Sequence, residues 1–133
     1  MEAKNLSKLN TTTLAYIGDA VYELAIRQML IESNPMNSGK AHNKAIKYVS
    51  SWGQAKAARE MCESTFLSEA EEKLLKRARN HRASSRPQNA DPRNYKWATG
   101  FEALIGYLYL AEDDARLKDV LAEAVRIIGS DNE

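Results

Sequence analysis

Two long apolar segments each carry one carboxylate close to a glycine, and they constrain the fold more than any other feature of the chain. The first, LAYIGDAVYELAI, holds Gly18 and Asp19; the second, ATGFEALIGYLYL, holds Gly100 and Glu102. At helical spacing both segments are apolar on nearly all sides, which is typical of helices in the middle of a bundle. Burying a polar group without a partner costs about 2–7 kcal/mol, and burying an ionised carboxylate costs more. The two carboxylates therefore favour a shared cation, such as a metal ion, as their partner.

Glycines inside the same two segments point to a close approach of backbones. Three of the six glycines of the chain, Gly18, Gly100 and Gly106, lie there. A glycine in a helix interior costs about 1 kcal/mol relative to alanine. We therefore expect another part of the molecule to contact the backbone at these positions.

The strings that surround the two carboxylates resemble a known pair of motifs. YIGDAVYEL resembles the signature of the ribonuclease III family, and TGFEALIGYLYL resembles the second acidic motif of that family. The pair is more specific than GDAV or FEAL alone, and the resemblance extends from about Leu9 to Ile128. Because no second domain follows, the chain is similar to the Mini-ribonuclease III branch, which consists of the catalytic domain alone.

Two positions depart from the larger family. That family usually has a glutamate four residues before the aspartate and an aspartate three residues before the glutamate, whereas this chain has Ala15 and Thr99. Both departures are typical of the Mini branch. They leave Asp19 and Glu102 as the two acidic metal ligands of a site, and the number of bound metal ions stays open.

The resemblance implies a function for these residues. Asp19 and Glu102 would be the catalytic residues and would hold Mg²⁺, for which Mn²⁺ can substitute, so that an activated water cleaves double-stranded RNA and leaves 5′-phosphate products. The enzyme would be a homodimer in which each subunit cuts one strand, with Tyr16 in the dimer interface. The expected substrate is a large-subunit (23S) ribosomal RNA precursor. Whether a large-subunit ribosomal protein takes part is left open.

Length and composition agree with a compact enzyme domain. At 133 residues the chain suits one all-α catalytic domain over residues 1–133, a helical bundle of the ribonuclease III type without a separate RNA-binding domain. The longest uninterrupted apolar run, Ala103 to Ala111, is too short for a bilayer, which needs about 20 residues, so no membrane is expected. One cysteine, Cys62, cannot form an internal disulfide, which fits the cytoplasm.

Capping residues and turn signals divide the chain into six expected helices. These run from Asn10 and the threonines that follow it to about Ile31, from Asn37 or Ser38 to about Val49, from Ser50 or Ser51 to about Cys62, from Ser68 to about Asn80, from about Lys96 to Ala111, and from Asp113 or Asp114 to Gly129. The segment HRASSRPQNADPRNY is expected to be a loop. LIGYLYL alone could pass for a buried strand, although no partner strand is visible.

Basic residues gather in two places despite a net charge of only +1. The second expected helix carries lysines at helical spacing, and the end of the fourth helix and the loop after it carry arginines. Such clusters suit the phosphate backbone of RNA. The expected RNA-binding residues are Lys40, Lys44, Lys47, Arg79, Arg82 and Arg86.

Two other classes of function remain at this point. The chain could be a catalytically inactive RNA-binding or ribosome-assembly module, which would bind a duplex without cleaving it. It could also be an all-helical nucleotide pyrophosphatase, although those enzymes usually place two glutamates one turn apart on a helix. Glu23, one turn after Asp19, could join the metal site, but an ion pair with a lysine or arginine is the favoured interpretation.

Overall fold

Every regular element in the described part of the chain is a helix. The computed structural model describes residues 1–33, 38–81 and 91–130. The helices are α1 (Ala3–Leu6), α2 (Thr11–Ser33), α3 (Ser38–Val49), α4 (Ser51–Glu63), α5 (Glu69–Asn80), α6 (Pro92–Leu110) and α7 (Asp114–Gly129). The all-α prediction is confirmed, and LIGYLYL lies within α6 rather than in a strand.

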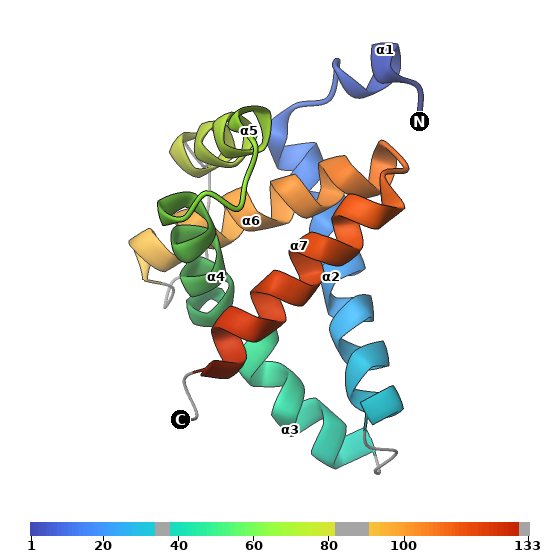
Figure 1. Cartoon of the computed structure of the whole chain (residues 1–133), viewed down its shortest axis with the longest axis vertical. Coiled ribbons are helices and arrows are strands. Elements are labelled where there is room, and N and C mark those ends of the chain that lie inside the picture. The colour runs from blue at the N-terminus through green and yellow to red at the C-terminus, as the bar shows by residue number, and fades with distance from the viewer. Residues whose placement is uncertain (34–37, 82–90, 131–133) are drawn as a thin grey trace.

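Helix α6 is the centre of the arrangement. Figure 1 shows α6 crossing the middle of the molecule, with α7 in front of it and α2 behind. Its most extensive contact is with α2, followed by those with α4 and α5. Side chains from all of these helices meet in one core, whose largest fully buried members include Leu14, Tyr22, Ile26, Met61, Leu75, Phe101, Leu104, Ile105, Val120 and Ile127.

The helix ends follow the capping residues in most places. The Asn10 side chain accepts a hydrogen bond of 2.8 Å from the backbone N–H of Thr13 at the start of α2. The predicted capping box at Ser68 is present. The predicted start of the fifth helix near Lys96 is wrong, because α6 begins at Pro92. Asp91 caps this end with its side chain, and proline suits the first helical position because its missing N–H has no intrahelical partner there.

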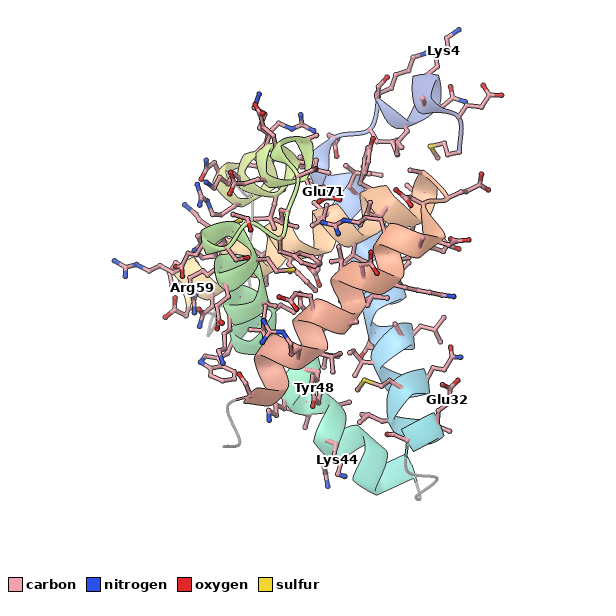
Figure 2. All side chains as sticks on the ribbon, in the orientation of Figure 1. Lys4, Glu32, Lys44, Tyr48, Arg59 and Glu71 are labelled. Atoms are coloured by element: carbon pink, nitrogen blue, oxygen red, sulfur yellow. The ribbon has the colours of Figure 1, made fainter. Side chains whose placement is uncertain are left out.

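Helix α7 is tied to α5 by one arginine. The Arg116 guanidinium donates two hydrogen bonds of 2.8 Å to the Glu71 carboxylate and one of 2.8 Å to the backbone oxygen of Phe66. It also lies 4.5 Å from the centroid of the Phe66 ring. Figure 2 shows Glu71 near the start of α5, on the side towards α7. Within the residues that the structure describes, no helix is both long enough and apolar enough to cross a membrane.

Candidate active site

Two glycines let α2 and α6 approach each other closely. A Cβ atom at Gly18 would overlap the backbone oxygen of Glu102 and would lie 2.9 Å from the backbone nitrogen of Gly106. A Cβ atom at Gly106 would in turn overlap the backbone oxygen of Leu14. Only glycine, which has no Cβ, permits this contact. The expected close approach of backbones is therefore confirmed, and the crossing brings the residue after Gly18 beside Glu102.

The two carboxylates of the sequence motifs meet at this crossing. Asp19 on α2 and Glu102 on α6 are joined by a side-chain hydrogen bond. Asp19 is exposed, whereas Glu102 is largely buried. The pair thus presents carboxylate oxygens from two helices, with one member open to solvent and the other held in the protein.

Burial raises the pKa of the Glu102 carboxyl to about 9, with further contributions from its hydrogen bond to Asp19 and from the negative charge of Asp19. A hydrogen bond from the Gln54 side chain acts in the opposite direction. Like charges this close disfavour double ionisation, so Glu102 keeps its proton at neutral pH and donates it in a hydrogen bond to Asp19. A cation placed between the two carboxyl groups would replace that proton.

Gln54 is a third member of this group that the sequence analysis missed. Its side chain is only 3% exposed, and its Nε2 donates a hydrogen bond of 3.0 Å to the backbone oxygen of Val49. Its Oε1 is buried and has no hydrogen-bond partner among the described residues. Its spacing in the sequence could have revealed it, because Gln54 lies on the same face of α4 as the buried Ala58 and Met61.

Tyr22 lies beside the carboxyl pair and is fully buried. Its ring meets that of Phe101 edge to face, with centroids 4.9 Å apart and planes at 87°. Its hydroxyl donates a hydrogen bond of 2.8 Å to the backbone oxygen of Tyr48, which joins α2 to the end of α3. Burial, Tyr48 and Glu102 together raise the pKa of the Tyr22 hydroxyl, so it stays protonated and acts as a donor.

The positions where the larger family has further carboxylates serve other purposes here. Ala15 is buried in the core, and the Thr99 hydroxyl donates a hydrogen bond of 2.9 Å to the backbone oxygen of Tyr95 within α6. Glu23 pairs with Arg27 at 3.1 Å, as the sequence favoured. Among the described residues, no group of three or more Asp, Glu, His or Cys side chains could hold a metal ion. Two carboxylates and one amide are thus the oxygen donors gathered at the site.

The lysines of α3 do not form one solvated face. Lys44 is exposed, and Figure 2 shows it on the outer side of α3. The Lys47 ammonium, in contrast, is buried without a hydrogen-bond partner among the described residues, 5.8 Å from the centroid of the Tyr48 ring. The Lys47 ammonium is therefore not on the exposed surface with the Lys44 side chain, and the assignment of both lysines to RNA binding stays a prediction. The side chain of Lys40 lies outside the described residues.

The arginines near the start of α6 are partly held by neighbouring side chains. The Arg79 guanidinium lies 4.5 Å from the centroid of the Trp97 ring, so its face is covered by an aromatic side chain of α6. Arg59 donates a hydrogen bond of 3.4 Å to Asn94, and Figure 2 places it at the edge of α4 that faces the start of α6. Arg59 is a basic residue of this region that the sequence analysis did not single out. The expected RNA contacts Arg82 and Arg86 lie outside the described residues.

One side of α2 carries exposed apolar side chains. Tyr16 is 83% exposed, Leu24 67% and Ile31 57%. Their spacing of eight and seven residues places them on one stripe of the helix. The expectation that this segment lies in the middle of the bundle is therefore wrong for one side of α2, because Tyr16 and Leu24 face solvent in the single chain.

Comparison with known proteins identifies the arrangement. The Ribonuclease III domain family matches residues 12–113, which include both carboxylates. The chain belongs to the ribonuclease III family. Mini-ribonuclease 3 of Enterococcus faecalis is 37% identical over 98% of this chain and 98% of its own length. Mini-ribonuclease 3 of Symbiobacterium thermophilum is 39% identical over 96% of this chain and 97% of its own length.

A solved structure has the same fold. A crystal structure of a protein from Fusobacterium nucleatum superposes with a TM-score of 0.77 at 25% identity, over 90% of this chain and 93% of that one.

Membership of the ribonuclease III family makes the chain an endoribonuclease, and the domain implies a double-stranded RNA substrate. Enzymes of the family generally depend on a divalent metal ion.

Proposed function

We propose that this ribonuclease III domain is a Mg²⁺-dependent endoribonuclease that cleaves double-stranded RNA as a homodimer, with Mn²⁺ able to replace Mg²⁺. The observation that carries this proposal is the hydrogen-bonded pair of Asp19 and Glu102 at the crossing of α2 and α6. A cation would stabilise this carboxyl pair, because it would offset the repulsion between the two carboxylates. In the metal-free protein, a proton on Glu102 relieves that repulsion.

The donor set fits a hard divalent cation. Mg²⁺ prefers oxygen ligands, binds through one or two carboxylates and keeps several waters. Asp19 and Glu102 supply the carboxylates, and the buried Oε1 of Gln54 is an acceptor that lacks a donor within the described residues. The soft and nitrogen ligands that zinc prefers are not gathered here, since no cluster with histidine or cysteine occurs in the described parts of the chain.

Asp19 and Glu102 would hold the ion, which supplies a water nucleophile at neutral pH and neutralises charge on the scissile phosphate. The contribution of the chain itself is to hold the two carboxyl groups in place. The glycine crossing fixes the separation of the two carboxyl groups, and the exposure of Asp19 leaves that side of the pair open to a phosphate oxygen. Tyr22, whose hydroxyl donates to the backbone oxygen of Tyr48, is fully buried beside Glu102. The expected products carry 5′ phosphates.

Replacing either carboxylate tests the catalytic assignment. Asp19→Asn or Glu102→Gln should abolish cleavage of a duplex RNA in Mg²⁺ while leaving the helical content and duplex binding unchanged, because shape is kept and charge is lost. Glu123→Gln, which removes a carboxylate from α7, is the matched control and should cleave normally. Normal turnover by either active-site variant would contradict the assignment. Duplex binding without cleavage by the unmodified chain would favour an inactive RNA-binding module.

We place the dimer contact on the exposed stripe of α2. Tyr16, at 83% exposure, is the most exposed large apolar residue of the described chain and lies three residues before Asp19. Tyr16→Asp should place an unpaired charge in the interface and weaken the dimer by several kcal/mol. Sedimentation equilibrium measures this directly, and Trp52→Asp, at an exposed aromatic residue on α4, is the control. A monomeric, active unmodified chain would refute the dimer.

For the natural substrate, we propose precursors of the large-subunit (23S) ribosomal RNA, cleaved in the cytoplasm. The support is the similarity over nearly the full chain to proteins named Mini-ribonuclease 3. Incubating the enzyme with total precursor RNA and mapping the new 5′ ends tests the substrate. The same experiment, with and without large-subunit ribosomal proteins, shows whether a protein partner is required.

A further inference from the structure

Gln54 is a polar residue at a buried position of α4. It is 3% exposed on the buried face of α4, in a helix whose other buried residues are Gly53, Ala55, Ala57, Ala58 and Met61. Helix α4 makes one of the most extensive contacts with α6, the helix that carries Glu102. A buried amide at this position requires an explanation beyond filling space, because polar groups lose stability on burial unless they are fully hydrogen-bonded.

Two hydrogen bonds fix the orientation of the Gln54 amide. Nε2 donates to the backbone oxygen of Val49, the last residue of α3, at 3.0 Å. The side chain also makes a hydrogen bond with the Glu102 carboxyl group. An amide nitrogen has two hydrogens, so these bonds can use its whole donor capacity. The side chain is therefore held between a rigid helix end and one of the two active-site carboxyl groups.

The other end of the amide is unsatisfied. Oε1 is buried and has no hydrogen-bond partner within the described chain. Orphaned buried acceptors are uncommon in native proteins and point to a strained site, a catalytic role or a missing water or ion. Because the nitrogen is held by Val49, the amide cannot turn over to satisfy Oε1 without losing that bond.

We propose that Gln54 is a positioning residue of the cleavage site: it orients the Glu102 carboxylate towards the metal ion, and its Oε1 accepts a hydrogen bond from a water of the ion's hydration shell. This inference rests on the proposed metal-dependent function. Partners that orient metal ligands usually contribute about 10- to 100-fold to metal affinity or activity. Gln54 is buried, so it does not contact the RNA.

The test compares the unmodified protein with Gln54→Met, which keeps the length of the side chain and removes the amide. The first measurement contains no RNA: the rise of the thermal midpoint with Mn²⁺ concentration, which reports metal binding without turnover. Gln54→Met should need about 10- to 100-fold more Mn²⁺ for the same rise. In Mg²⁺, its kcat for duplex RNA should fall by a similar factor, while KM stays unchanged. If Gln54→Met fails to fold, Gln54→Asn carries the test, because the shorter amide cannot reach both partners.

A second variant on the same helix separates positioning from general destabilisation. Met61→Val removes buried atoms from α4 and should lower the thermal midpoint while leaving the Mn²⁺ dependence and kcat unchanged. If Gln54→Met lowers only the thermal midpoint, Gln54 is a structural link between α3 and α6 and the inference is overturned. If the unmodified protein neither binds Mn²⁺ nor cleaves duplex RNA, the proposed function itself fails, and the two failures are thereby distinguished.

Discussion

Metal binding to the RNA-free protein should release a proton from the carboxyl pair. Burial and the neighbouring Asp19 raise the pKa of Glu102 to about 9. At pH 7 the folded protein therefore holds this proton, and a divalent cation that binds both carboxylates must displace it. The experiment is a series of Mn²⁺ titrations at pH values between 7 and 9 and at constant ionic strength.

The expected size follows from the pKa. At pH 7, two units below a pKa of about 9, roughly one molecule in a hundred has an ionised Glu102. The apparent free energy of metal binding is then weaker by about 2.7 kcal/mol than for the ionised site. The affinity for the metal ion should rise about tenfold from pH 7 to pH 8, rise less steeply near pH 9, and level off only above that pH. The proton released per ion should be close to one at pH 7 and about one half at pH 9.

Isothermal titration calorimetry in buffers of different ionisation enthalpy measures the number of protons released. Glu123→Gln is the control, because Glu123 pairs with Arg126 on α7 rather than with either carboxyl group of the crossing, and should leave the release unchanged. Saturable binding of Mn²⁺ at pH 7 with no proton release, and with an affinity independent of pH, would show that the metal ion does not displace a proton from Glu102.

The same pKa determines whether the metal-free protein becomes more or less stable as the pH rises. Glu102 ionises in the unfolded chain near the ordinary value of 4.5 and in the folded protein at about 9. Between these values the folded state binds more protons, so the free energy of unfolding falls as the pH rises. Denaturant unfolding at pH 5 and pH 8 tests this, and Glu102→Gln should reduce the slope.

Three further predictions concern the helix crossing, the ion pair of Glu71 with Arg116, and the basic residues Arg82 and Arg86. Gly106→Ala should lower the free energy of unfolding in urea by about 1–3 kcal/mol through overpacking at the helix crossing, whereas Gly129→Ala, where a Cβ lies 3.5 Å from its nearest neighbour, should not. Glu71→Gln should lower the free energy of unfolding by about 1–3 kcal/mol at pH 7. The hydrogen bonds from Arg116 lower the pKa of Glu71. In thermal melts, the difference in stability between the unmodified protein and the variant should therefore shrink as the pH falls below about 4. Replacing Arg82 and Arg86 together by alanine should flatten the salt dependence of duplex binding by a slope of about 0.9 or less per lost phosphate contact, as measured by filter binding.

Most helix boundaries were predictable because they depend on local chemistry. Asn10 and Ser68 cap helices with their own side chains, and such bonds are visible as residue types in the sequence. The start of α6 was placed four residues too late, because the small polar residues of the preceding segment obscured the Asp91-Pro92 start signal. The short α1 was not predicted, since four residues carry no helical period.

The site was predictable only as far as its motifs reach. Asp19 and Glu102 were identified from two strings, and the glycines indicated close contact, but which helix approaches which glycine is a property of tertiary packing. Gln54 was missed because its role depends on a carboxyl group 48 residues away in the chain. Lys47 was grouped with Lys44 by its helical spacing, yet its ammonium is buried.

The backbone contact between Gly18 and the carbonyl of Glu102 has a consequence for engineering this enzyme. Because Asp19 and Glu102 belong to helices that touch backbone to backbone, no side chain acts as an adjustable spacer at this contact. Substitutions on the outer face of α2 can alter assembly or substrate preference without changing the distance between the carboxyl groups. A larger residue at the crossing changes that distance whatever else is redesigned. Libraries that seek altered activity should therefore keep both glycines fixed and vary the surface around them.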